Sequence, residues 1–463
     1  MLRGLAYVLC RVFFRNIYIS GTPYVGRSCI WCANHTSGIV DPAVMMGLAP
    51  VTLRPLSKHT LFSHPVMKPL LTAARAIPVY RMQDMKKEVA AQKEVLSKGV
   101  ASNEWRSNAN SDAFQAVADS LLAGDCLLIF PEGVSHDEPY LHKLRTGMAR
   151  MALQAMVHNT DPNFAVILQP VAIDYFEKDE FRSDLAFHYC EPIVVTSPDM
   201  EVEDLMLGVH NSLLEGLAQF ATWDEKRNWH FIFEIAYGRT PHSAREFRNF
   251  VDLKRPVFTK DPVFLARIQT MRRMMQAMNI EPFQLIWGET HDLKRSFFKL
   301  IAFHGWFHIF VSVPIMFLSG ICWFVPYRLC GKLAELSTKD RDVLATMKVG
   351  HGLWIFPSWA GIFSFLLTWC YLQLFPSLPV FVAAFFGIMT GPILLVLGIL
   401  CVERRDFFPG YWKLARLRLL APRSWREVMA EWREISEGVI EMINSDGETM
   451  GFRNQLIQEN SAS

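Results

Sequence analysis

Three clusters of polar residues follow apolar runs of the chain, and their residue types suit acid–base chemistry and anion binding. The first cluster holds His35 and Asp41, with five residues between them, directly after the apolar run 28–33. A carboxylate that holds one imidazole nitrogen leaves the other able to take a proton, so the pair predicts a general base and its orienting group. A lone histidine–aspartate pair is more often structural than catalytic, and both interpretations stay open at this point.

The second cluster is an arginine at the end of an apolar run. Residues 77–80 read as a strand, and Arg81 follows directly. A guanidinium carries a permanent charge and a planar fork of donors, which suits a phosphate group. A strand-end arginine is also a common surface charge, so this residue alone does not establish a site.

The third cluster lies beyond the apolar run 126–130 and combines a carboxylate, a glycine and a hydroxyl. Its residues are Glu132, Gly133 and Ser135. Glycine permits close approach of the backbone, and the two side chains supply hydrogen-bonding oxygens. Two basic residues follow within one loop and are further candidates for substrate binding: Lys143 and Arg145.

The elements that must position these clusters alternate between strands and helices over residues 20–225, the pattern of an α/β sheet. Expected strands cover 28–33, 77–80, 126–130, 166–171 and 186–189, and expected helices cover 42–48, 60–75, 112–123, 145–158 and 201–221. Function in such sheets sits in loops beyond the strand ends, which is where all three clusters lie.

Together and in this order, the clusters resemble the glycerophospholipid acyltransferase family, whose members move a fatty acyl group from a thioester to glycerol phosphate or a lysophospholipid. The matching blocks span about residues 20–200: Asn34-His35…Asp41, Ile77–Arg81, Phe130–Ser135, and Val166–Val171 with Pro170. The usual family spacing leaves four residues between His and Asp, whereas five intervene here. The fungal-type glycerol-3-phosphate/dihydroxyacetone-phosphate acyltransferases look similar in this respect, and in an arginine block that extends here to Asp84.

This resemblance implies a mechanism without a covalent enzyme intermediate. His35, helped by Asp41, would remove a proton from the acceptor hydroxyl, which attacks the thioester. The resemblance implies that the acceptor is bound by Arg81, Glu132, Gly133 and Ser135, with Lys143 and Arg145 as weaker candidates. The resemblance implies no cofactor, with acyl-CoA as a co-substrate.

Two further pairs have the spacing of metal ligands, Cys29 with Cys32 and His304 with His308. The cysteines have no second pair spaced to complete a site, and the histidines have no nearby carboxylate, so we predict no metal. Structural cysteines and membrane-interface histidines are the simpler interpretations.

Three functions compete. The first is acyl transfer to the sn-1 hydroxyl of glycerol 3-phosphate, or to dihydroxyacetone phosphate, which makes lysophosphatidate for phospholipid and triacylglycerol synthesis. The second is an acyltransferase for 1-acylglycerol 3-phosphate or another lysophospholipid. The third is an inactive membrane scaffold, against which the intact polar residues argue. The acyl-chain preference, the choice of coenzyme A or a carrier protein, and the oligomeric state do not follow from the sequence.

Composition points to a membrane. Of 463 residues, 51% are hydrophobic and only 20% are charged, against a typical value of about 25%. The net charge of +2 gives no support to a nucleic-acid partner. Nine cysteines without dense spacing favour reduced thiols over a secreted disulfide scaffold.

Two apolar stretches lie in the second half of the chain. Residues 349–402 hold 54 residues without charge, enough for two spans, which we expect at 353–374 and 379–401. A second stretch, 300–327, is long enough for one span. Basic residues flank it on both sides, so the positive-inside rule favours a re-entrant hairpin bent at Pro314 over a single span.

The remaining segments are expected at the membrane surface. Residues 1–19 read as an amphipathic interface helix, with an ordinary first helix of the soluble domain as the alternative. Residues 226–296 read as a basic helical linker, because 226–299 carry 14 Lys/Arg against 7 Asp/Glu. Their aromatic residues would be drawn with these bases to anionic lipid: Trp229, Phe231, Phe233 and Tyr237. Residues 404–463 read as a cytoplasmic helical tail.

The predicted architecture is therefore an α/β acyltransferase domain over 20–225, a mixed sheet flanked by helices, followed by an α-helical membrane region over 297–403. The expected partners are acyl-CoA, glycerol 3-phosphate and a lipid bilayer, with no nucleic acid. The expected location is the endoplasmic reticulum membrane with the catalytic domain facing the cytosol, or alternatively a bacterial cytoplasmic membrane.

Overall fold

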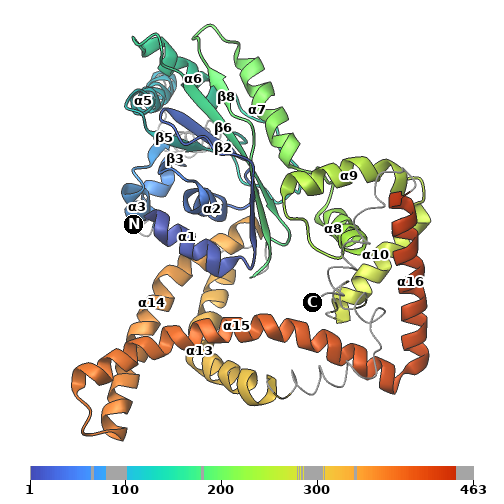
Figure 1. Cartoon of the computed structure of the whole chain (residues 1–463). Coiled ribbons are helices and arrows are strands. Elements are labelled where there is room, and N and C mark those ends of the chain that lie inside the picture. The colour runs from blue at the N-terminus through green and yellow to red at the C-terminus, as the bar shows by residue number, and fades with distance from the viewer. Residues whose placement is uncertain are drawn as a thin grey trace. The chain divides into compact units, whose positions relative to one another are not determined.

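The computed structural model describes residues 2–63, 67–79, 102–178, 182–278, 308–337 and 341–444, together with Ile280, Pro282, Leu285 and Trp306. The chain divides into two compact units (Figure 1). Unit 1 comprises Met1–Trp223 and His242–Asn249, and unit 2 comprises Asp224–Pro241 and Phe250–Ser463.

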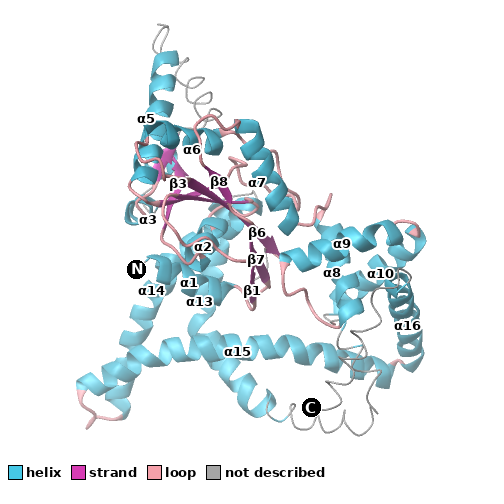
Figure 2. Cartoon of the chain, turned by 45° about the horizontal axis from the view of Figure 1, so that its top comes forward, coloured by secondary structure: helices cyan, strands magenta, loops and turns pink. Residues whose placement is uncertain are grey.

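Unit 1 is built on a mixed sheet, drawn as magenta arrows in Figure 2. Within the described residues it has eight strands in the order β1-β7-β6-β2-β5-β3-β4, with β8 beside β6. The strands are β1 (Ile17–Ser20), β2 (Cys29–Ala33), β3 (Leu53–Lys58), β4 (Ile77–Val79), β5 (Cys126–Ile129), β6 (Val166–Tyr175), β7 (Leu185–Tyr189) and β8 (Ile193–Val195). Only the pairs of β6 with β7 and with β8 are antiparallel among the described pairs, so the predicted mixed sheet is confirmed.

Burial in the centre of the sheet explains which strands could be predicted from the sequence. Every residue of β2, β5, β6 and β7 is buried, and such strands read as continuous apolar runs. Three strands were not predicted: β1, β3 and β8, which are short or only partly buried. β6 also continues to Tyr175, four residues beyond its predicted end, and this extension reaches the polar loops.

Helices pack on this sheet and close its core. Apolar residues of α5 (Ser102–Leu122), α6 (Gly147–His158) and α7 (Val202–Gly216) form one buried cluster with β2, β5 and β6. Other described helices of residues 2–79 are α1 (Leu2–Phe13), α2 (Val40–Leu48), the 3-10 turn His59–Ser63 and α3 (Met67–Ala73).

The amino terminus differs from the predicted interface helix 1–19. Helix α1 ends at Phe13, and residues 17–20 form strand β1 of the sheet. One face of α1 packs closely on α2, where a Cβ on Gly47 would lie 2.9 Å from the α1 backbone. The other face exposes large apolar side chains, namely Leu5, Tyr7, Val8 and Val12. The segment is thus the first helix of unit 1 and still carries an apolar outer face.

Residues 226–296 were predicted as a linker, but their described part forms packed helices of unit 2. These are α8 (Trp223–Tyr237), α9 (Ala244–Phe258) and α10 (Pro262–Met278). The aromatic residues expected to meet lipid form a core instead: Trp229 and Phe233 are 4% and 0% exposed, and the Trp229 ring lies 5.6 Å from that of Phe258. The basic charge of this segment had suggested a surface position. The sequence does not show which face of each helix is covered by other helices.

The carboxyl-terminal segment is also more than a tail. Helix α15 (Val380–Leu420) leads into α16 (Pro422–Asn444), which packs on α8, α9 and α10. Arg267 of α10 forms ion pairs with Glu431 at 3.0 Å and Glu434 at 2.8 Å. Trp432 of α16 is fully buried.

Three helices among the described residues are long and apolar enough to cross a membrane: Phe310–Ser337, Gly350–Leu374 and Val380–Leu400. They belong to α13 (Val313–Ser337) with its preceding π-turn His308–Ser312, α14 (Arg341–Leu374) and α15. The favoured bend at Pro314 is absent, because Pro314 lies in the first turn of a continuous α13, where proline is tolerated. His304 lies outside the described residues.

Candidate active site

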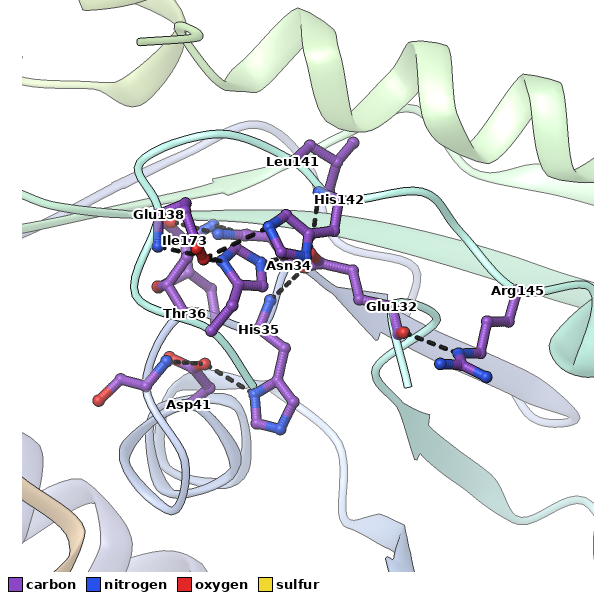
Figure 3. A network of polar contacts seen from close by, with 12 residues as sticks. Asn34, His35, Thr36, Asp41, Glu132, Glu138, Leu141, His142, Arg145 and Ile173 are labelled. Atoms are coloured by element: carbon purple, nitrogen blue, oxygen red, sulfur yellow. Dashed lines mark hydrogen bonds and ion pairs between the residues drawn. The ribbon is translucent and has the colours of Figure 1, made fainter. Parts of the chain in front are cut away.

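The loop after β2 brings His35 and Asp41 together. The Nδ1 atom of His35 lies 2.9 Å from Oδ2 of Asp41, the second residue of α2 (Figure 3). The backbone N–H of Ser37 donates to the same oxygen at 2.7 Å. The five intervening residues therefore make a turn that closes on the carboxylate, and the unusual spacing preserves the pair.

The geometry defines which imidazole nitrogen can act as a base. With Nδ1–H donating to Asp41, the lone pair lies on Nε2, which can take a proton. The imidazole packs against the Phe130 ring, with ring centres 4.1 Å apart, and its side chain is 9% exposed. A fixed tautomer in a nearly dry position is what general-base catalysis requires.

Asn34 ties this loop to the centre of the sheet. Its side chain accepts the N–H of Ile173 at 2.8 Å and donates to the carbonyl of Ile173 at 2.9 Å. The parallel pairing of β2 with β6 ends at Ala33, so the amide continues the ladder by one more pair. This bond fixes where His35 leaves the sheet.

Glu132 occupies the centre of the network rather than its surface. Its Oε1 accepts the backbone N–H of His35 at 2.6 Å, and its Oε2 accepts the N–H of His142 at 2.9 Å and contacts Nε2 of His136 at 2.5 Å. The side chain is fully buried. The contacts of Glu132, which was predicted to bind substrate, join the loop after β5 to the loop after β2.

Glu132, His136 and His142 also form the cluster that comes nearest to a metal site among the described residues. Their ligand atoms lie within 4.8 Å of one another. The imidazoles of His136 and His142, however, are stacked: their ring centres lie 3.6 Å apart, and their planes are 5° from parallel. An imidazole binds a metal along the in-plane lone pair of its nitrogen, so two parallel stacked rings do not both direct lone pairs at one ion. The arrangement fits a hydrogen-bonded network, completed by Glu138 at 3.2 Å from His136.

Gly133 and Arg145 are brought into contact. Gly133 has a φ of +76°, and a Cβ there would lie 2.6 Å from the Arg145 side chain, so the position requires glycine. Arg145 donates from Nε to the carbonyl of Glu132 at 3.1 Å, and it is exposed. Lys143 is also exposed and Ser135 is half-buried. Arg81 lies outside the described residues.

Sequence reasoning missed residues that hold the two loops together from a distance. Lys178 is buried, donates from Nζ to the carbonyl of Thr36 at 2.9 Å and pairs with Asp137 at 2.5 Å. Tyr175 donates its hydroxyl to Asp41. Tyr175 ends the extended β6 and Lys178 follows it, and no motif marked either residue. His136 and Asp137 directly follow the block Phe130–Ser135, and that position was the detectable signal.

The cysteine pair of β2 lies inside the sheet. Cys29 and Cys32 are fully buried, and burial raises the pKa of both thiols, so they stay protonated at neutral pH. The thiolate is the reactive and metal-binding form.

Part of the chain matches a family of known proteins. Residues 16–174 match the family model Acyltransferase. These residues are therefore a domain of the Acyltransferase family.

Two relatives from Saccharomyces cerevisiae are similar to this chain. "Glycerol-3-phosphate O-acyltransferase 2" is 28% identical over 294 residues, which cover 56% of this chain and 38% of that protein. "Glycerol-3-phosphate O-acyltransferase 1" is 23% identical over 376 residues, covering 73% of this chain and 47% of that protein. The chain thus spans less than half the length of these relatives.

Among solved structures, the 1-acyl-sn-glycerophosphate (LPA) acyltransferase PlsC from Thermotoga maritima is similar at a TM-score of 0.32 and 16% identity. The match covers 46% of this chain and 75% of that one. At this distance the likeness supports no functional comparison.

Proposed function

We propose that this protein is a membrane-bound O-acyltransferase that transfers a fatty acyl group from acyl-CoA to the sn-1 hydroxyl of glycerol 3-phosphate, or to dihydroxyacetone phosphate. The observation that carries the proposal is the His35–Asp41 contact at the end of β2 inside an acyltransferase-family domain. The names of the two yeast relatives support glycerol 3-phosphate as the acceptor. With glycerol 3-phosphate as the acceptor, the product would be lysophosphatidate, an intermediate of phospholipid and triacylglycerol synthesis.

The proposed reaction uses one base for both proton movements. Nε2 of His35 takes the proton of the acceptor hydroxyl while its oxygen forms a bond to the thioester carbonyl carbon. The resulting oxyanion collapses, the carbon–sulfur bond breaks, and the leaving sulfur takes the proton back from the imidazolium. Asp41 stabilises the imidazolium between these steps. General-base help of this kind is worth about 10²–10⁴-fold in rate.

The acceptor phosphate would bind on the exposed side of the loop after β5. Arg145 and Lys143 are exposed there, and Arg145 is fixed over Gly133 by its bond to the carbonyl of Glu132. Arg81 remains a proposed phosphate ligand because a planar fork of donors suits that group. Ser135 is proposed to bind a glycerol hydroxyl.

An assay of the purified full chain tests the acceptor. Labelled acyl-CoA is offered with glycerol 3-phosphate, dihydroxyacetone phosphate and lysophosphatidate in turn. We expect transfer to one of the first two to exceed transfer to lysophosphatidate at least tenfold. Preference for lysophosphatidate would support the lysophospholipid alternative, and no transfer from acyl-CoA or acyl carrier protein would support the inactive scaffold.

The packing of unit 2 limits how its helices cross a bilayer. Helices α10 and α16 are held together by the ion pairs of Arg267, so they lie on the same side. The number of complete crossings between them must then be even, although three helices are candidates. Residues 281–299 carry six charges and offer no further span. We propose that the α14–α15 hairpin crosses twice and that α13, a continuous helix with basic residues on both flanks, lies along the membrane interface without crossing.

Labelling of single cysteines tests this arrangement in a Cys370→Ser background, since Cys370 is exposed. Cysteines are placed at Lys260, at Ser424 and at Ser377 in the hairpin turn, all exposed positions. We expect the first two to react from one side and the third from the other. Labelling of 260 and 424 from opposite sides would contradict the even number of crossings.

The proposed location is the endoplasmic reticulum membrane with unit 1 facing the cytosol, and a bacterial cytoplasmic membrane is the alternative. Arg404 and Arg405 follow the last apolar stretch, and basic residues mark the cytoplasmic side. No described residue before α10 belongs to a candidate span, so unit 1 would share that side.

A further inference from the structure

Asp41 is a fully buried carboxylate of the candidate site. Its side chain has no exposed surface, so water does not stabilise its negative charge. A buried carboxylate stays ionised and fixed only where hydrogen-bond donors replace that water. One oxygen, Oδ2, receives the N–H of Ser37 and contacts His35. The other oxygen, Oδ1, points away from His35 and needs a donor of its own.

That donor is Tyr175, the last residue of β6. Its hydroxyl lies 2.5 Å from Oδ1 of Asp41, and its side chain is 1% exposed. The Phe14 ring packs against the tyrosine ring, with centres 5.8 Å apart. Tyr175 therefore holds a single orientation, fixed by the sheet at its backbone and by α1 at its ring.

We propose that Tyr175 is a positioning residue for acyl transfer, the third member of a Tyr175–Asp41–His35 hydrogen-bonded series that holds the carboxylate aimed at the proposed base. The proposal rests on the proposed function of His35. It adds that the catalytic geometry depends on the part of β6 that lies beyond its pairing with β2.

The titratable groups around this series favour the hydroxyl as a donor. Burial raises the pKa of Tyr175 well above 10, and the charge of Asp41 raises it further, so the phenol stays protonated. The Cys10 thiol of α1 also influences Tyr175, and burial raises the pKa of Cys10 to about 12, so it stays neutral. Asp41 contacts the Tyr175 hydroxyl directly, and His35 contacts Asp41.

The first test is Tyr175→Phe, which removes the hydroxyl and keeps the ring. Hydrogen bonds to charged groups are stronger than neutral ones, and loss of a buried donor leaves the acceptor oxygen unpaired. We expect kcat to fall about 10-fold, with the KM values for acyl-CoA and glycerol 3-phosphate changing less than about twofold. A uniform loss of stability without a change in kcat would overturn the proposal.

Tyr189→Phe is the matched control. Tyr189 is also a buried tyrosine of the sheet, and its hydroxyl bonds the carbonyl of Leu48 at 3.1 Å, at the other end of the helix that carries Asp41. This change removes a buried hydroxyl near α2 without touching the carboxylate. We expect its kcat to stay within about twofold of the parent, and an equal loss in both variants would assign the effect to packing.

A double substitution tests whether the Tyr175 hydroxyl affects kcat only by holding Asp41. If Tyr175 works only by holding the carboxylate, then adding Tyr175→Phe to Asp41→Asn should lower kcat less than about twofold further. A full additional 10-fold loss would show that the hydroxyl acts elsewhere, and it would contradict the proposed series.

A readout that needs no acyl transfer keeps the inference separate from the proposed function. Diethyl pyrocarbonate modifies neutral imidazole, and mass spectrometry can follow the peptide that contains His35 across a range of pH. Without the tyrosine donor, Asp41 offers more negative charge to His35, so the midpoint of its reactivity should move to higher pH in Tyr175→Phe. An unchanged midpoint would overturn the inference, whichever acceptor the enzyme proves to use.

Discussion

Unit 1 buries charged side chains at the ends of β2 and β5, whereas the apolar helices of unit 2 expose large apolar ones. Asp41 and Glu132 have no exposed side-chain surface. Phe365 of α14 and Phe381 of α15 are 73% and 76% exposed. The buried charges are stabilised by specific donors, and exposed apolar side chains are stable where the surroundings are lipid rather than water. Unit 1 therefore has an interior that suits folding in water, whereas these helices of unit 2 have the surface expected of helices in lipid.

The largest expected effect comes from breaking the site of unit 1 at its base. His35→Ala should lower acyl transfer by at least about 10²-fold, because no other group in the dyad can take the proton. Transfer rates of purified protein measure this loss. His158→Ala, at an exposed position at the end of α6, should leave the rate unchanged. A His35 variant that keeps more than about a tenth of the rate would contradict the general-base role.

Glu132→Gln should break the link between the two loops of unit 1. Each carboxylate oxygen accepts a backbone N–H, so an amide NH₂ must face a donor whichever way it turns. Disrupting a buried pair costs about 3–5 kcal/mol. For a unit of this size that corresponds to about 6–20 °C in Tm. Scanning calorimetry can measure the shift.

Glu138→Gln is the control for this change, since Glu138 belongs to the same network with a side chain that is 44% exposed. We expect its Tm to fall by less than about 4 °C, as for a surface ion pair worth about 1 kcal/mol or less. Equal shifts in the two variants would mean that burial does not decide the role of Glu132.

The same substitution in both regions sharpens the comparison of their solvents. Ile362, midway along the apolar part of α14, is 56% exposed, and Val157 of α6 is 65% exposed. Arginine at the centre of a membrane helix costs about 2.5–3.5 kcal/mol, whereas a surface change in water stays within about 0.5 kcal/mol. Ile362→Arg should therefore lower membrane insertion in a glycosylation-tag assay. Val157→Arg should change neither the membrane insertion nor the Tm. Normal insertion of Ile362→Arg would argue against a lipid-facing α14.

The smallest expected effect concerns a buried histidine of unit 2. Burial, with a lesser contribution from Lys226, holds the pKa of His230 well below 6.5. The unfolded chain binds a proton below about pH 6.5 while the folded chain does not, so stability falls as the pH drops through that range, by at most about 1.4 kcal/mol per unit. Denaturant unfolding at pH 7.5 and 5.5 should show a smaller fall for His230→Gln than for the parent. His158→Gln, at an exposed position, should behave as the parent does.

The sequence by itself determined the parts of this protein that depend on local pattern. Continuous apolar runs identified the central strands β2, β5 and β6, and the uncharged stretch 349–402 identified the α14–α15 pair. The dyad was also readable, because His35 and Asp41 stand in one loop and need only a turn to meet. Each of these features has its cause within about 50 residues of chain.

Only the tertiary structure decided what surrounds those parts. Asp41 meets Tyr175 across 134 positions, and the carboxylate of Glu132 meets the backbone of His35 across 97. The aromatic residues of α8, expected at a lipid surface, are buried in unit 2 because helices distant in the chain cover them. A hydrophobic pattern shows that a residue will be buried, but the partner that covers it or donates to it is set by how distant segments pack, which no local spacing records.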